Sequence, residues 1–253
     1  MSELTFFACG ETTHDMSLLL RGAPRERRVF PAGVFLYDSG ARRVLFDTGY
    51  APEPWRAGLG GWAYRRMLPP RVGAGDTIAE QLDPATITHV VLSHLHPDHV
   101  GGVRFFPNAA FVLSDEARRT LERPRLRDGL LRDLLPPWFR EARVLPSPAF
   151  RSGPRGLRTA DLFGDGSYLL VDLPGHTRGH LGALIEHEVL LAGDAAWGRD
   201  LLGEERRIRL LPRLVSHDMT RQRETARMLL AAEQDGLRLL FSHDHHPTGQ
   251  NLL

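Results

Sequence analysis

The feature that most constrains this chain is a cluster of histidines and one aspartate that begins where a short apolar run ends. Residues 90–92 read Val-Val-Leu, which is typical of a buried strand. His94, His96, Asp98 and His99 follow in the pattern H-x-H-x-D-H. A single histidine at a strand end more often packs in the core, but imidazole and carboxylate groups at this spacing suit Zn, Fe, Mn, Co or Ni. The motif therefore predicts a metal site.

The spacing within the motif favours two ions rather than one. Pro97 lacks a backbone donor and fixes φ, so the strand cannot continue through it. His94 and His96 can share one face of an extended segment, whereas Asp98 and His99 lie beyond the turn and can reach a second position nearby. Four ligands this close are too crowded for one tetrahedral ion with an open position. We therefore expect two adjacent ions, each completed by ligands from elsewhere in the chain.

Length and composition are those of an ordinary globular protein. The 253 residues are 42% hydrophobic and 25% charged, which allows a substantial core and predicts a single domain over residues 1–253. The sequence has no run of about 18 apolar residues, so no membrane span is expected. The N-terminus lacks the features of a signal peptide, and the single cysteine, Cys9, cannot form an intrachain disulfide. These features favour a cytoplasmic protein.

Charge argues against a nucleic-acid partner. The chain has 32 basic and 31 acidic residues, and every basic residue is an arginine. The two densest arginine clusters, at residues 25–28 and 204–209, are interleaved with glutamates and are typical of solvated faces. The lack of lysine also excludes lysine Schiff-base and P-loop chemistry. A small-molecule substrate is therefore expected.

Apolar runs and capping residues predict two sheets with helices outside them. The predicted strands cover residues 4–9, 33–37, 43–47, 90–92, 110–113, 168–173, 181–185, 189–192 and 237–241. The predicted helices are a short one capped by Asp76 that ends at Leu82, one that Ser114 caps, one within residues 124–160, and one over residues 219–233 that Asp218 caps. Residues 10–31 show no clear period and are expected to form a polar excursion.

Residues 51–72 form an unusual aromatic stretch among glycines, prolines and arginines. Two interpretations stay open. The stretch is either a lid or pocket wall beside the metal site, or an amphipathic helix packed on the core. The side chains in question are Trp55, Leu59, Trp62, Tyr64, Met67 and Leu68.

Three later segments could complete the metal site, because each follows an apolar strand. They are Pro-Gly-His-Thr-Arg-Gly-His at residues 174–180, Leu-Leu-Ala-Gly-Asp at residues 190–194, and Leu-Leu-Phe-Ser-His at residues 239–243. His180 lies four residues after His176 and is interpreted as a structural histidine rather than a ligand.

Together these motifs resemble those of the metallo-β-lactamase superfamily. That family shows H-x-H-x-D-H, a Gly-His-Thr motif, an aspartate at a strand end and a late histidine, and all appear here in that order, with Asp-Thr-Gly at residues 47–49 as an early match. The resemblance implies an α/β fold, an αββα sandwich of two mixed sheets with helices on the outer faces. It also implies two divalent ions, most often Zn²⁺. One ion would take His94, His96 and His176, the other would take Asp98, His99 and His243, and Asp194 would bridge both.

Within the superfamily the chain most resembles N-acyl homoserine lactonases. The resemblance lies in Ser-His-Asp at residues 242–244, in Asp-Ala-Ala-Trp at residues 194–197, and in the capped helix that leads into the last strand. It implies that a metal-bridging hydroxide opens a lactone or ester whose acyl chain is apolar. Asp98 would pass a proton to the leaving group, and Trp197 would stand where the family usually has a tyrosine that contacts the substrate carbonyl. Tryptophan offers only an indole N–H donor. Assembly into a homodimer is left open.

Other functions were weighed against the lactonase. Glyoxalase-type thioesterases carry a helical C-terminal extension, whereas this chain ends ten residues after His243. Ribonuclease-type members need a basic surface, and flavodiiron-type members carry a glutamate where His96 stands. The alternatives retained are a hydrolase of thioesters, aryl esters or phosphodiesters, and a regulatory protein that binds metal without catalysis.

Overall fold

Two mixed sheets form the centre of the computed structural model, which describes residues 2–52, 57–145 and 148–253. The first sheet has the order β1 (Glu3–Asp15), β2 (Arg27–Asp38), β3 (Arg43–Phe46), β4 (His89–Val91), β5 (Ala110–Val112) and β6 (Val144–Leu145). The second has the order β12 (Arg238–Leu240), β11 (Val189–Leu191), β10 (Leu181–Ile185), β9 (Tyr168–Asp172), β8 (Arg158–Asp161) and β7 (Arg151–Ser152). Strands β3 to β6 are parallel, as are β11 and β12, and the other pairs are antiparallel.

Strand β2 shows why the sheets are layered. Its side chains alternate between two apolar clusters, as the period of a strand requires. Phe35 and Tyr37 pack between the sheets against Tyr168 of β9. Val34 and Leu36 pack on the other side of the first sheet, in the cluster that includes residues of its covering helices. Both faces of β2 are therefore buried.

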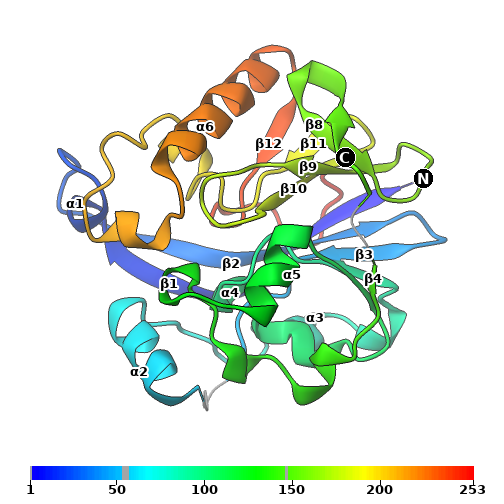
Figure 1. Cartoon of the computed structure of the whole chain (residues 1–253), viewed down its shortest axis with the longest axis horizontal. Coiled ribbons are helices and arrows are strands. Elements are labelled where there is room, and N and C mark those ends of the chain that lie inside the picture. Colours follow the sequence, from blue (N-terminus) through cyan, green and yellow to red (C-terminus); the bar gives the residue numbers. More distant parts are fainter. Residues whose placement is uncertain (1, 53–56, 146–147) are drawn as a thin grey trace.

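Helices cover the outer faces of the two sheets (Figure 1). On the first sheet lie α3 (Ile78–Gln81), α4 (Pro97–Val100) and α5 (Asp115–Glu122), and on the second lies α6 (Met219–Gln234). Ala226 and Leu229 of α6 pack against apolar side chains of the second sheet, with Met228 and Leu230 partly buried beside them. The expected αββα sandwich is confirmed. No helix in the described ranges is long and apolar enough to cross a membrane.

The remaining helical segments are short or lie at the periphery. They are α1 (Met16–Leu19), α2 (Gly58–Met67) and the 3₁₀ turns η1 (Pro84–Thr86), η2 (Gly101–Phe105), η3 (Leu126–Asp128), η4 (Arg132–Leu134), η5 (Pro137–Arg140), η6 (Pro154–Gly156), η7 (Arg199–Leu201) and η8 (Pro212–Val215). The helix predicted within residues 124–160 is wrong. The described part of this region holds only 3₁₀ turns and short strands, because its prolines interrupt any longer helix.

The prediction for residues 10–31 is also wrong in part. Strand β1 continues to Asp15, and β2 begins at Arg27, so the two strands form one long antiparallel hairpin that pairs Thr12 with Phe30. A register shift between Ala8 and Glu11 interrupts the pairing. Many side chains beyond the shift are half-buried or exposed, and such strands carry no clear apolar period.

Two of the three predicted helix caps are confirmed. Ser114 accepts a hydrogen bond from the Ala117 amide, and Asp218 accepts from two amides at the start of α6. Asp76 does not cap α3, since its carboxylate accepts from the Gly73 amide in the preceding loop. The helix is capped by Thr77 instead, and Glu80 accepts from the Thr77 amide at 3.1 Å. The hydrogen bond within the loop therefore occupies the Asp76 carboxylate that was expected to cap the helix.

The aromatic stretch forms the helix α2, but not one whose apolar residues are all buried. Leu59, Trp62 and Met67 are 87%, 67% and 62% exposed. Tyr64 faces inward, and its hydroxyl lies 3.2 Å from that of Tyr50. Trp55, which was part of the same prediction, lies outside the described residues. The part of the stretch that is described therefore offers an apolar surface to solvent.

Replacing Asp218 tests how much the N-terminal cap of α6 contributes to stability. Asp218→Ala removes the acceptor for the Thr220 and Arg221 amides, and we expect the free energy of unfolding to fall by about 1 kcal/mol. The measurement is denaturant unfolding, with Glu224→Ala as the control because Glu224 is exposed on the same helix. Equal effects of the two substitutions would contradict the assigned cap.

Candidate metal centre

Strand ends from both sheets meet at one edge of the sandwich and bring together the seven predicted ligands. The loop and short helix after β4 carry His94, His96, Asp98 and His99, while His176 follows β9, Asp194 follows β11 and His243 follows β12. Strands β9, β11 and β12 run in one direction, so their carboxyl ends lie at the same edge of the second sheet. All seven ligands are buried except Asp98, whose side chain is 12% exposed.

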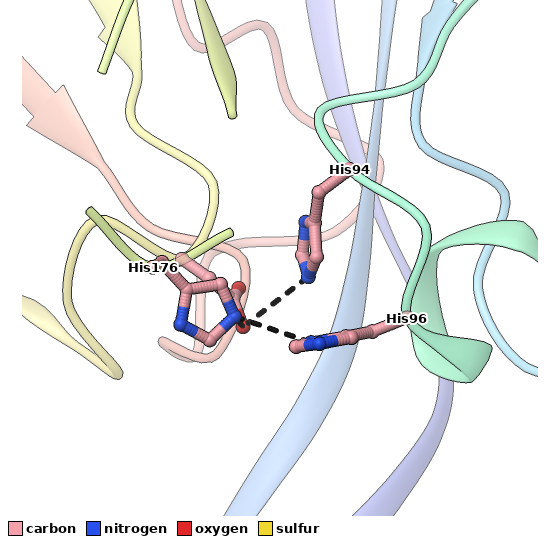
Figure 2. A group of neighbouring side chains, drawn as sticks. His94, His96 and His176 are labelled. Atoms are coloured by element: carbon pink, nitrogen blue, oxygen red, sulfur yellow. Dashed lines mark hydrogen bonds and ion pairs between the residues drawn. The ribbon is translucent and has the colours of Figure 1, made fainter. Parts of the chain in front are cut away.

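The first group of donor atoms comes from His94, His96, His176 and Asp194, which offer ligand atoms within 4.8 Å of one another. Figure 2 shows the three imidazoles converging from opposite sides of the site. Nε2 of His176 lies 3.2 Å from Nδ1 of His96, so His96 turns its Nδ1 edge toward the shared space. The arrangement would give one ion three imidazoles and a carboxylate.

The second group comes from Asp98, His99 and His243. One oxygen of Asp98 lies 3.6 Å from Nε2 of His99 and 3.6 Å from Nε2 of His243. Asp194 lies between the groups: its Oδ1 is 3.3 Å from Nε2 of His99, and its Oδ2 is 3.4 Å from Nε2 of His176 and 3.1 Å from Nε2 of His243. A single carboxylate thus reaches both groups.

Burial and charge set the protonation of these groups in the absence of ions. Burial lowers the pKa of His94, His96 and His176, which favours the neutral imidazole that binds metal. Burial alone would also lower the pKa of His243, but Asp194 and Asp98 raise it to about 9. The carboxylates therefore hold a proton on His243 that a metal ion would displace.

Several donor atoms have no other use in the fold. Nε2 of His94 is buried without a hydrogen-bond partner among the described residues, and Nε2 of His99 and Oδ1 of Asp194, which lie 3.3 Å apart, do not meet the geometry of a hydrogen bond. Buried polar atoms are costly unless something satisfies them. All three belong to the groups above, and imidazole with carboxylate is a donor set that suits divalent ions. The residues therefore fit a dinuclear divalent metal site.

Residues that orient the ligands were not identified as such from the sequence. Oδ2 of Asp47 lies 2.7 Å from Nδ1 of His99, and Asp47 also accepts bonds from the amide and hydroxyl of Ser93. Nδ1 of His243 lies 2.7 Å from the Pro31 carbonyl, to which it donates. Such partners fix the ring and leave Nε2 for metal. The strand-end motif at Asp47 was the available signal, because β3 is parallel to β4.

The other predicted residues lie outside both groups. His180 is buried and accepts a hydrogen bond from the Asp194 amide at 3.0 Å, which agrees with a structural role. Trp197 is half-buried and packs against the apolar cluster of Phe30. The Phe30 ring centroid is 6.3 Å from that of His243, so this cluster adjoins the centre. Contact between Trp197 and a substrate stays a prediction.

Comparison with known proteins gives a consistent family. The family model described as the metallo-beta-lactamase superfamily matches residues 27–243. A probable metallo-hydrolase of Mycobacterium tuberculosis is 31% identical over 235 residues, which cover 85% of this chain and 74% of that protein. The N-acyl homoserine lactonase AttM of Azorhizobium caulinodans is 29% identical over 231 residues, which cover 85% of this chain and 82% of that protein.

Solved structures show the same fold at lower identity. One is an N-acyl homoserine lactone hydrolase with the product N-hexanoyl-L-homoserine bound at its catalytic metal centre. It has a TM-score of 0.72 and 19% identity, and the match covers 96% of this chain and 93% of that one. A probable metal-dependent hydrolase of Staphylococcus aureus has a TM-score of 0.72 and 16% identity, with 98% and 91% covered.

A measurement of metal content would distinguish the roles of His176 and His180. His176→Ala removes an imidazole from the first group and should leave about one ion per chain, whereas His180→Ala should retain about two, as in the unmodified protein. Elemental analysis after reconstitution with zinc measures both. Equal loss in the two variants, or at most one ion in the unmodified protein, would contradict the ligand assignment.

Proposed function

We propose that this chain, which belongs to the metallo-β-lactamase superfamily, is a hydrolase that opens lactones or esters, and that N-acyl homoserine lactones or close analogues are its substrates. The observation that carries the proposal is the complete set of seven donor residues, in which Asp194 reaches both groups. The relatives named as N-acyl homoserine lactonases support the substrate class, because they match over most of both chains.

The proposed ligands follow the two groups. His94, His96 and His176 would hold one ion, Asp98, His99 and His243 the other, and Asp194 both. Zn²⁺ is the expected metal, and Fe, Mn, Co or Ni would also suit these donors. When bound, two such ions supply a hydroxide at neutral pH and stabilise charge on the carbonyl and leaving oxygens.

Asp98 is the proposed proton carrier. Its side chain is the most exposed of the seven, at 12%, and it lies beside the His243 edge of the centre. A carboxylate in this position can accept the proton that remains on the attacking hydroxide oxygen and deliver it to the leaving alkoxide, which completes ring opening. Trp197 is proposed as a donor to the substrate carbonyl through its indole N–H, since its cluster adjoins His243 through Phe30.

The helix α2 is the proposed support for an apolar acyl chain. Its residue Tyr64 reaches Tyr50, three residues after the ligand-orienting Asp47. Burial raises the pKa of the Tyr64 hydroxyl well above its usual value, and the carboxylates of Asp98 and Asp194 raise it further. The inner face of α2 therefore lies close to the metal centre, while Trp62 and its apolar neighbours are exposed.

The remaining properties of the protein are proposed from composition. The formal net charge of +1 supports a small-molecule substrate rather than a nucleic acid. Single Cys9, which is buried, is compatible with a reducing compartment, and we propose the cytoplasm. Assembly into a homodimer is a further proposal that size measurement in solution would decide.

A substrate screen tests the proposed reaction. The metal-loaded protein should hydrolyse N-acyl homoserine lactones with a kcat/KM at least about tenfold above those for aryl esters, thioesters, β-lactams and phosphodiesters, a difference of about 1.4 kcal/mol in transition-state stabilisation. Asp98→Asn removes a metal ligand and the proton carrier together and should abolish turnover. A higher kcat/KM for another class would replace the lactone. Two bound ions without turnover on any class would favour a regulatory metal-binding protein.

Acyl-chain length tests the role of α2. Each buried methylene contributes about 0.8 kcal/mol, so four more methylenes should raise kcat/KM by roughly two orders of magnitude if fully buried. Trp62→Ala should flatten this dependence and leave metal content unchanged. Leu210→Ala is the control, since Leu210 is 79% exposed outside α2. No dependence on chain length in the unmodified protein would show that α2 does not contact the acyl chain.

A further inference from the structure

A partly buried ion pair joins two segments that flank the metal centre. Arg178 follows His176 by two residues, and its guanidinium donates to both carboxylate oxygens of Asp128. The distance from Nη2 to Oδ2 is 2.6 Å, and the distance from Nε to Oδ1 is 3.2 Å. Asp128 is buried, and its oxygen also accepts from the Arg125 amide at 2.6 Å. Two parallel charged hydrogen bonds both stabilise the contact between the guanidinium and the carboxylate and fix their relative orientation.

The residue after Asp128 packs directly on a predicted metal ligand. Gly129 has φ +66, and a Cβ built at this position would lie 2.5 Å from Cδ2 and 2.6 Å from Nε2 of His96. No side chain fits in that space, so the backbone itself contacts the outer edge of the imidazole. The opposite edge of the same ring carries Nδ1, which faces His176. His96 is therefore confined between the Gly129 backbone and the metal centre.

The two segments are held differently. The segment that carries His176 is tied to the start of α6, because the amides of His217 and Asp218 donate to the carbonyls of His176 and Gly175 at 2.7 and 2.9 Å. The segment that carries Gly129 has the 3₁₀ turn η3, and Leu130 and Leu131 after it pack against apolar clusters. The bond between Asp128 and Arg178 connects the segment of Gly129 to the segment of His176.

The Asp128 carboxylate is charged at neutral pH. Burial alone would raise the pKa of the Asp128 carboxyl, but the hydrogen bonds from Arg178 and the Arg125 amide lower it below its usual value. Removing either charge would leave the other partly buried without a partner, which favours displacement of the segment into solvent.

We propose that Asp128 and Arg178 are positioning residues for the metal centre, which press the Gly129 backbone against His96 and so aim Nδ1 of His96 at the ion in the first group. The pair touches no donor atom, and its effect is confined to the group of His94, His96 and His176. The inference concerns metal binding and holds whatever substrate the centre acts on.

Metal affinity in two backgrounds tests the proposal. His243→Ala keeps the first group, and His176→Ala keeps the second. In the His243→Ala background, Asp128→Asn should weaken Zn²⁺ binding by about 10- to 100-fold, the usual effect of losing a group that orients a ligand. In the His176→Ala background it should change affinity by less than about twofold, whereas Asp47→Asn, which loses the partner of His99, should show the reverse pattern. Competition with a chromophoric chelator measures each affinity.

Two matched controls isolate the ion pair. Asp172→Asn breaks a pair with Arg158 at 3.1 Å that lies outside the metal centre and should leave both affinities unchanged. Arg178→Lys keeps the positive charge and loses the two-pronged geometry, so it should weaken the first group less than Asp128→Asn does. Circular dichroism checks folding, and Arg178→Lys carries the test if Asp128→Asn does not fold. Equal loss in the two backgrounds, or no loss in either, would overturn the proposal.

The contact through Gly129 has its own test. Gly129→Ala keeps the ion pair but places a methyl group against His96, so it should weaken the first group and spare the second. Gly164→Ala is the control for backbone strain, because Gly164 has φ +79 with no atom within 4 Å of its added Cβ. Normal metal binding by Gly129→Ala in the His243→Ala background would overturn the proposed route from Asp128 to His96.

Discussion

The metal centre depends on one buried carboxylate that lies between two groups of imidazoles. Asp194 is 3.3 Å from His99 on one side and 3.4 Å from His176 on the other. His99 follows a strand of the first sheet, whereas His176 and Asp194 follow strands of the second. The two sheets must therefore be packed together before the carboxylate can lie between both groups. In the absence of metal, burial penalises the charge of Asp194, and the neighbouring His243 and His99 outweigh this and lower its pKa. The packing of the two sheets and the assembly of the metal centre thus both involve the Asp194 carboxylate.

The surroundings of the ligands hold them in different ways. Asp47 and the Pro31 carbonyl meet the outer nitrogens of His99 and His243 through hydrogen bonds. His180 accepts from the Asp194 backbone rather than contacting an ion. His96 is held on its outer edge by the Gly129 backbone, whose segment depends on the pair of Asp128 and Arg178. Such outer contacts matter because a ligand that is free to turn loses affinity for its ion.

In the proposed function, the apolar surface around the metal centre determines which substrates it selects. The hydrolytic centre of the superfamily serves many substrates, so the substrate class must come from the surfaces around it. Here the inner face of α2 meets Tyr50 near the centre, while Trp62 and Met67 remain exposed. Single exposed apolar side chains are common on protein surfaces. Leu59, Trp62 and Met67 together on one short helix form an apolar surface suited to an acyl chain.

The sequence by itself predicted the sandwich and a set of seven donor residues that the fold brings together, since each predicted ligand motif directly follows an apolar strand whose length and direction fix where it ends. It failed for residues 10–31, because a half-exposed hairpin has no apolar period, and for Asp76, because a local loop bond competed with the cap. Only the tertiary structure decided which residues support the ligands. Asp47 with His99, and Asp128 with Arg178, are separated by 52 and 50 residues. No local pattern encodes such distant pairs, which form only when the folded strands and loops bring their charges into contact.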